Sequence, residues 1–291
     1  MAHWQCTSLS RDDDGIRSVV EPPLMTVTIG VSTMADMPNA TSPTSPMSSV
    51  ALTDEISPFI SDLGSKYMLD PATAEIGKAA GYSDGFAFYF AGRGGVLGDV
   101  DADVIYSAFM FFDQPLVRKM WERGIAIEGA RKAGSRYAGA ADAWGVAHIS
   151  GFAGAARFNA LAEKVVASVD AGGLSLFAGL RAEALPANPH ARTYRLVTYL
   201  RELRGCLHIN AVVAEGLTGL EAVLTGENGD FFAKIHGYQE PYPDVAHLAP
   251  ARARAEVTTA KLMSGIYEQS LTPAERGEFA ALVTELKAAV V

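Results

Sequence analysis

Cysteine is scarce in this chain of 291 residues, which contains two, Cys6 and Cys206. Two cysteines are too few for a disulfide framework or a cysteine-rich zinc site, and they suit a reducing compartment. The chain also lacks an apolar run of the roughly 18 residues that a membrane span needs. Asp12, Asp13 and Asp14 occur near the start, where a secretory signal peptide carries positive charge. The sequence therefore predicts a cytoplasmic protein with no membrane partner.

Positive charge is also in short supply. The chain has 24 lysine and arginine residues against 33 aspartate and glutamate residues, which gives a net charge of -9. Such a surface repels DNA and anionic lipid unless a local basic patch exists. The most basic stretch after residue 50 carries Arg131, Lys132 and Arg136, but Gly129 and Gly134 weaken it as a recognition helix. Nucleic acid is therefore disfavoured as a partner.

Alternation of polar and apolar residues, the pattern of a half-buried strand, is missing after residue 50. Helix caps and helical spacing are frequent there, and 49% of the chain is hydrophobic, enough for one large core. Residues 1–50 show little periodicity and include a segment rich in Ser, Thr and Pro. We expect an all-α, multi-helix single domain over 51–291 after a disordered leader over 1–50. Translation from Met25 or Met34 instead of Met1 would also explain the leader.

The longest predicted helix follows Asn188, an N-cap residue, and Pro189 at the first helical position. No proline interrupts it and Gly216 is a natural stop, so it can run for about 26 residues, or about 39 Å. We expect this central helix to organise the domain. Its core-facing stripe consists of Leu196, Leu200, Leu203, Leu207 and Ala214.

A second stripe on the same helix carries Tyr194, Arg201, Arg204, His208 and Glu215. Guanidinium groups bind carboxylates and phosphates, and imidazole can move a proton near neutral pH. If the protein is an enzyme, His208 is the candidate proton carrier and Arg204 the charge-stabilising group. The alternative is structural: the arginines lie along the surface with hydrated head groups, and His208 is hydrogen-bonded at the edge of the core.

Caps, prolines and glycines predict the other helices. Glycines such as Gly124 and Gly145 are expected to end or break them. The last two helices form either a C-terminal hairpin or a homodimer interface over residues 251–291. The expected ranges are 58–68, 71–80, 83–93, 101–112, 114–123, 174–183, 251–268 and 273–289.

Two further places are candidates for contact with a ligand. Arg93 begins the run RGGVLG, which lacks the spacing of a phosphate-binding loop and is better explained as a helix end, with Arg93 free to face a pocket. Phe112 and Asp113 lie at the corner between two helices and could line an aromatic-walled pocket, with plain core packing as the alternative. The alternating aspartates at 99–103 lack the glycine and glutamate of a calcium loop, so no metal site is predicted.

Two stretches of the sequence resemble one known family, an actinobacterial group of helical proteins of unassigned function that carries a helix-turn-helix name. The similarity extends over residues 57–225. It rests on GFAFYFAGRGGVLGDVDADVIYSAFMFFDQPLVRKMW and LRELRGCLHINAVVAEGLTGLEAVL. The family's L-R-E-H-R-G-x-x-H run is matched except at Leu203, where a histidine is common. Leu63 and Pro71 replace a His and a Glu that flank an early tyrosine, here Tyr67. The turn-and-wing glycine pattern of the family's C-terminal winged-helix-like segment is not recognisable in the sequence.

These features lead to one leading hypothesis and two alternatives. We expect a helical protein that holds a small anionic or aromatic ligand in an interior pocket, with catalysis by His208 and Arg204 as an open question. The alternatives are a DNA-binding regulator of helix-turn-helix type and a helical scaffold without a pocket. The sequence identifies no cofactor. The expected ligand-binding residues are Arg93, Phe112, Asp113, Arg201 and Tyr67.

Overall fold

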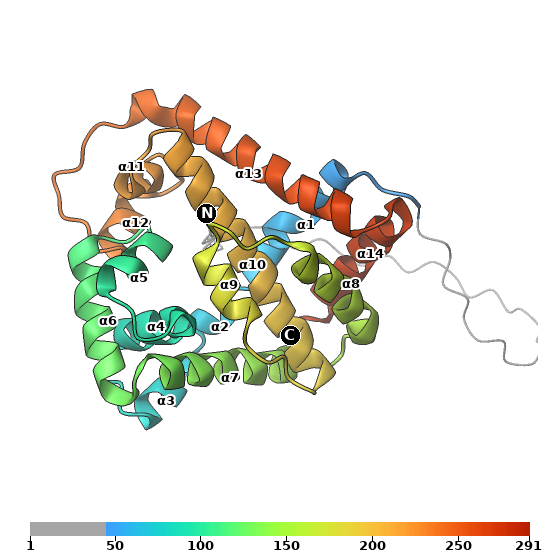
Figure 1. Cartoon of the computed structure of the whole chain (residues 1–291), viewed down its shortest axis with the longest axis horizontal. Coiled ribbons are helices and arrows are strands. Elements are labelled where there is room, and N and C mark those ends of the chain that lie inside the picture. Colours follow the sequence, from blue (N-terminus) through green and yellow to red (C-terminus); the bar gives the residue numbers. More distant parts are fainter. Residues whose placement is uncertain (1–44) are drawn as a thin grey trace, which may run out of the picture. The chain divides into compact units, whose positions relative to one another are not determined.

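The regular structure of the protein is entirely helical over residues 45–291, which are the residues that the computed structural model describes (Figure 1). The all-α prediction is therefore confirmed for this range. The predicted leader lies outside the described residues up to residue 44, and its last two residues, Ser49 and Val50, already belong to the first helix. Every helix described below belongs to one structural unit.

Most of the helices follow one another with short connections, the exception being residues 236–248 between α12 and α13, and two helices, α10 and α13, are much longer than most of the others. The elements are α1 Ser49–Leu63, α2 Lys66–Leu69, α3 Pro71–Ala79, α4 Gly85–Gly94, α5 Ala102–Ala108, α6 Gln114–Glu128, α7 Ala130–His148, α8 Ala155–Ser168, α9 Ser175–Arg181, α10 Pro189–Ala214, α11 Gly219–Leu224, α12 Gly229–Ile235, α13 Ala249–Ser270 and α14 Pro273–Ala289, with short 3-10 turns η1 Gly95–Leu97 and η2 Ala246–Leu248.

Helix α10 runs through the middle of the domain, as the sequence predicted (Figure 1). It is 26 residues long, and the Asn188 side chain accepts hydrogen bonds from the backbone N–H groups of His190 and Ala191. It packs against α1, α7, α8, α9 and α13, so it is buried on almost every side. The four leucines of the predicted stripe are buried. Ala214 is exposed, because the helix leaves the core before its last turn.

Two glycines that the sequence predicted as helix ends lie inside helices instead. Helix α6 continues through Gly124, and α7 continues through Gly145. A Cβ atom on Gly124 would lie 2.4 Å from the carbonyl oxygen of Ala87 in α4, and one on Gly145 would lie 2.6 Å from the Cβ of Tyr194 in α10. These positions are glycine because neighbouring helices approach too closely for a side chain.

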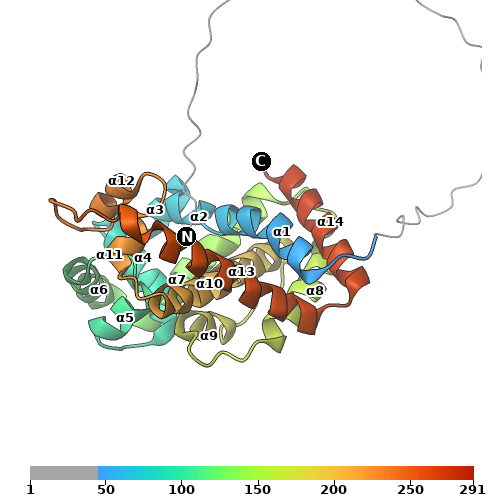
Figure 2. The same ribbon diagram turned by 90° about the horizontal axis from the view of Figure 1, so that it is seen from above.

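The first helix begins earlier than predicted. A start at Pro58 was expected, but α1 begins at Ser49, where the Ser48 hydroxyl accepts a hydrogen bond from the Ala51 N–H, and Pro58 lies inside the helix. Buried residues such as Leu52 and Ile56 pack this segment against α13 and α14 (Figure 2). Burial of that apolar face outweighs the hydrogen bond that an internal proline removes.

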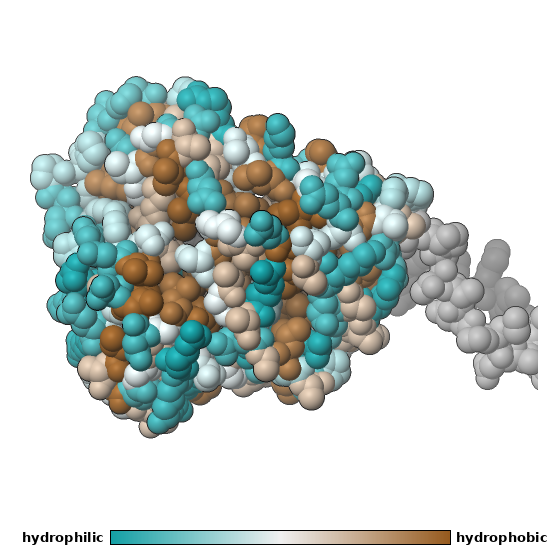
Figure 3. Space-filling view, in the orientation of Figure 1, coloured by the Kyte–Doolittle hydropathy of each residue, from teal (hydrophilic) through white to brown (hydrophobic). Residues whose placement is uncertain are grey.

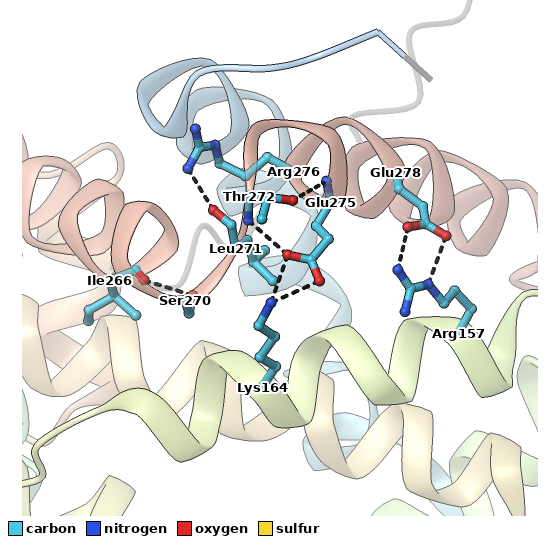
Figure 4. Close-up of polar contacts among 9 residues, drawn as sticks. All are labelled: Arg157, Lys164, Ile266, Ser270, Leu271, Thr272, Glu275, Arg276 and Glu278. Atoms are coloured by element: carbon cyan, nitrogen blue, oxygen red, sulfur yellow. Dashed lines mark hydrogen bonds and ion pairs between the residues drawn. The ribbon is translucent and has the colours of Figure 1, made fainter. Parts of the chain in front are cut away.

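Helix α14 starts as predicted and is fixed to α8 by charged pairs (Figure 4). Thr272 and Glu275 form a reciprocal capping box at its N-terminus. Glu275 also accepts hydrogen bonds from Lys164 at 2.8 and 2.7 Å. One turn further along α14, Arg157 forms a two-pronged pair with Glu278, at 2.8 and 2.7 Å. The cap and the ion pairs together orient this end of the chain on α8.

The surface mixes polar and apolar side chains, and on the face shown in Figure 3 apolar residues gather around α5. Large apolar side chains are exposed singly elsewhere, for example Val257 on α13 and Phe231 on α12. Single exposed apolar residues are normal for a folded chain. Within residues 45–291, no helix combines the length and the apolar composition needed to cross a membrane.

Candidate functional site

A buried carboxylate on α10, Glu202, binds two arginines. Arg93, from the last turn of α4, donates from Nε and Nη2 to the two Glu202 oxygens at 3.0 and 2.7 Å. Arg201 donates from Nη1 to the same carboxylate. The Glu202 side chain is 3% exposed, and the arginines are 13% and 12% exposed. Burial alone would raise the pKa of Glu202, but the two guanidinium groups hold it below its usual value.

Three tyrosines surround this group. Tyr89, one turn before Arg93 on α4, accepts a hydrogen bond from Arg93 Nη1 at 3.1 Å. The rings of Tyr67 and Tyr137 contact each other with centroids 5.0 Å apart, and Tyr89 meets the Tyr137 ring edge-on. Burial raises the pKa of Tyr67 and Tyr137 well above the usual value, so both hydroxyls are neutral hydrogen-bond donors. We call Tyr67, Tyr89, Arg93, Tyr137, Arg201 and Glu202 the Glu202 cluster.

Tyr194 holds Tyr67 in place from α10. Its hydroxyl accepts a hydrogen bond from the Tyr67 backbone N–H at 3.1 Å and donates one to the Leu63 carbonyl at 2.8 Å. The hydroxyl therefore spans the break between α1 and α2, where both backbone groups have lost their helical partners. Burial raises the pKa of Tyr194 above its usual value, which keeps this donor protonated.

The Glu202 cluster is incompletely satisfied. Its two arginines and one glutamate leave one net positive charge, since the tyrosines are neutral. Two of its buried donor atoms, Arg201 Nε and the Tyr137 hydroxyl oxygen, have no hydrogen-bond partner among the described residues. Buried donors without partners are uncommon in folded proteins and cost free energy. The cluster therefore has the charge and the free donors to accept an anion.

The second predicted pair, His208 and Arg204, lies in another group further along α10. Arg204 Nη2 binds Glu256 of α13 at 2.8 Å. His208 Nδ1 lies 2.9 Å from the Thr259 hydroxyl, which itself donates to the Ala255 carbonyl at 2.7 Å. Nδ1 must therefore carry the proton, and Nε2 is an unprotonated acceptor. We call His208, Arg204, Glu256 and Thr259 the His208 cluster.

The imidazole of His208 is completely buried, and burial lowers its pKa to about 2. In the free protein it is therefore neutral at physiological pH and acts as a hydrogen-bonding group. Its Nε2 atom has no partner in the described part of the chain. Burial would raise the pKa of Glu256, but the adjacent charges, including Arg204, keep it below its usual value.

The turn between α5 and α6 contacts both clusters. The guanidinium of Arg93 lies over the Phe109 ring at 4.3 Å, Phe111 stacks on His208 at 5.9 Å, and Phe112 contacts Tyr89 at 5.8 Å. The backbone N–H of Asp113 donates to the His236 carbonyl at 2.8 Å, which ties the turn to the end of α12. Burial raises the pKa of Asp113 above its usual value. The predicted aromatic corner therefore faces α10.

Gly205 separates the two clusters on α10. It lies four residues after Arg201 and three before His208, so all three share one side of the helix. A Cβ atom on Gly205 would meet one atom within 4 Å beyond its own helical surroundings, Glu202 Oε2 at 3.8 Å. A Cβ atom would therefore fit at this glycine, unlike at Gly145, whose missing side chain admits a neighbouring helix.

The structure thus brings three of the predicted ligand-binding residues, Arg93, Arg201 and Tyr67, into one cluster, while Phe112 reaches that cluster through Tyr89. Asp113 lies at the start of α6 and does not touch it, and the predicted catalytic residues lie in the other cluster. Sequence reasoning passed over Glu202, although it lies within the L-R-E-L-R-G run. Tyr137 and Thr259 were also missed, because α7 and α13 bring them to the site from distant parts of the chain.

The basic stretch considered for DNA contact is partly paired with carboxylates within the protein. Arg136 forms a two-pronged pair with Glu128 at 2.8 Å for both contacts, and Lys132 lies 3.8 Å from the same carboxylate. Arg131 donates to the Val96 carbonyl at 2.7 Å and lies 3.7 Å from Glu183. Paired arginines have less charge available for phosphate groups.

The fold and its buried charge clusters define a helical protein with charged groups assembled along one central helix. Comparison of the sequence with family models shows more: the chain belongs to a helix-turn-helix family, whose model matches residues 55–242. The chain matches no curated protein and no solved structure. Within the described residues, no group of three or more His, Cys, Asp or Glu side chains is placed to hold a metal ion.

Proposed function

We propose that the protein binds a small organic anion at the Glu202 cluster. The observation that carries the proposal is the pair of buried donors without partners, Arg201 Nε and the Tyr137 hydroxyl, in a cluster with one net positive charge. A carboxylate could accept from both donors and neutralise the charge. The aromatic rings of Tyr67 and Tyr89 favour an anion attached to an apolar body.

Glu202 has a defined part in this proposal. It holds Arg93 through both oxygens and Arg201 through one, so each guanidinium has a fixed orientation before a ligand arrives. Preorganised groups bind more tightly because their rotamer entropy is already lost. Since Glu202 uses Arg201 Nη1, the Nε side of that guanidinium is left for the ligand.

Calorimetric titration with benzoate tests the proposal, with benzamide as a neutral ligand of similar shape. We expect benzoate to bind, benzamide not to bind, and benzoate affinity to fall as salt rises. Tyr137→Phe should leave stability nearly unchanged, because the hydroxyl has no partner to lose, but should weaken benzoate by about tenfold. Tyr82→Phe is the matched control, since its hydroxyl contacts Glu128 outside the cluster. Equal behaviour of benzoate and benzamide would contradict the proposal.

Catalysis by His208 and Arg204 is not part of this proposal. Arg204 is engaged by Glu256, and the low pKa of His208 makes it a weak base in the free protein. A cytoplasmic location does belong to the proposal, because Cys206 is a free, buried thiol that suits a reducing compartment.

DNA binding is the second candidate function, and the name of the family favours it. The paired state of Arg131 and Arg136 and the net charge of -9 weigh against it. A gel-shift assay with duplex DNA at rising salt distinguishes the two. Steeply salt-dependent DNA binding without benzoate binding would favour the regulator.

A further inference from the structure

His208 offers a buried acceptor that no residue in the described part of the chain uses. Its ring is fully buried, its Nδ1–H is bound by Thr259, and its Nε2 has no partner among residues 45–291. A buried acceptor without a partner costs free energy, and this cost is removed if a ligand donates a hydrogen bond to it. Because the ring is neutral, Nε2 suits a hydroxyl or amide N–H rather than an anion.

The acceptor lies on the same side of α10 as Arg201, one member of the Glu202 cluster. Arg201 and His208 are seven residues apart, which is about two turns or roughly 10 Å along the axis. Gly205 lies between them, and a Cβ atom there would meet only Glu202 Oε2, at 3.8 Å, outside its own helical surroundings. The Phe111 ring, which stacks on His208, and the Phe112 ring, which contacts Tyr89, come from the turn that reaches both clusters. An elongated, flat ligand could therefore lie across Gly205.

Building on the proposed anion site, we propose that the ligand is a hydroxy-aromatic carboxylate that spans both clusters. Its carboxylate binds Arg201 Nε and the Tyr137 hydroxyl, its ring lies over Gly205 beside Phe111, and a hydroxyl at its far end donates to His208 Nε2. Each part of this ligand is matched to one observation. The carboxylate matches the net positive charge and the unpartnered donors of the Glu202 cluster, the ring matches the missing side chain of Gly205, and the hydroxyl matches the unpartnered buried acceptor of His208.

The test compares 4-hydroxycinnamate with cinnamate, two flat acids that differ in the distal hydroxyl. By calorimetric titration, the wild-type protein should bind 4-hydroxycinnamate at least about tenfold more tightly than cinnamate. In His208→Phe the ratio of the two affinities should fall to near one. Equal affinities in the wild-type protein, or a ratio that survives the substitution, would overturn the inference.

Two further measurements test the inference even if the His208→Phe variant does not fold. In the wild-type protein, the 15N resonance of His208 Nε2 should move when 4-hydroxycinnamate is added and stay in place with cinnamate. Gly205→Leu, which fills the space beside α10, should weaken both acids by at least about tenfold. An unmoved resonance with bound 4-hydroxycinnamate would show that the hydroxyl does not reach His208.

Titration with benzoate distinguishes the proposed anion site from the proposed ligand that spans both clusters. Benzoate carries the acid group but is too short to reach from Arg201 to His208. Binding of benzoate together with equal affinities for the two cinnamates would leave the anion site standing and refute the spanning ligand. Failure of benzoate and of both cinnamates to bind would refute both.

Discussion

Replacing Glu202 with glutamine should destabilise the protein strongly, because the substitution keeps the shape of the side chain and removes its charge. Arg93 and Arg201 would then be two buried cations without a counter-ion. The NH2 group of the glutamine would also face arginine N–H groups, and two donors cannot form a hydrogen bond with each other. Glu202 is 3% exposed and Arg93 is 13% exposed, so water screens this group little. Breaking a buried ion pair from one side costs about 3–5 kcal/mol. For a domain of this size, that corresponds to a fall in Tm of roughly 6–20 °C.

Glu278→Gln provides the matched control. Glu278 also accepts two hydrogen bonds from one arginine, Arg157, but these side chains are 34% and 49% exposed (Figure 4). Exposed pairs contribute less than about 1 kcal/mol. Differential scanning calorimetry at low and high salt should therefore show a small, salt-sensitive loss for Glu278→Gln and a large, salt-insensitive loss for Glu202→Gln. Losses of equal size would refute the claim that the Glu202 carboxylate is a buried, preorganised charge.

Two other predictions concern glycine and histidine positions. In α7, Gly139→Ala should stabilise the protein by up to about 1 kcal/mol, because no atom beyond the surrounding turns of its own helix lies within 4 Å of the new Cβ. Gly145→Ala should destabilise it by about 1–3 kcal/mol through its clash with Tyr194. Calorimetry that shows the same sign for both would contradict this. Burial lowers the pKa of His236 from 6.5 to about 4, so folding favours the neutral form of the ring. The contribution of this neutral ring to the unfolding free energy is present above pH 6.5 and is lost as the pH falls toward 4. His236→Gln should reduce the loss of unfolding free energy between pH 7 and 4 by up to about 3 kcal/mol in urea titrations, and an unchanged slope would speak against a buried neutral ring.

Local signals in the sequence were enough to predict where several helices begin. Asn188–Pro189 and Thr272–Pro273 start α10 and α14 as expected, because a cap is formed by residues within one turn of each other. The predictions failed where tertiary contacts determine whether a glycine or a proline lies inside a helix or at its end. Gly145 was expected to break α7, and Pro58 to start α1, but packing against α10 and α13 keeps both residues inside helices.

The candidate site was predicted in part for the same reason. Helical spacing placed Arg201 and His208 on one side of α10, and each of these two residues belongs to one of the two clusters. Spacing along one helix could not reveal that Arg93 comes from α4 to pair with Glu202, or that Thr259 comes from α13 to fix the tautomer of His208. Those contacts depend on how distant helices pack, and pairings of this kind are not encoded in any local pattern.

The hydroxyl of Tyr194 links the docking of α10 to two backbone groups at the break between α1 and α2. The Tyr67 N–H donates to it across 127 residues of sequence, and the Leu63 carbonyl accepts from it across 131. The break between α1 and α2 can therefore take its final form only after α10 has docked. Hydrogen exchange at the Tyr67 amide then reports the separation of α10 from the N-terminal helices, because this amide loses its Tyr194 partner when α10 moves away.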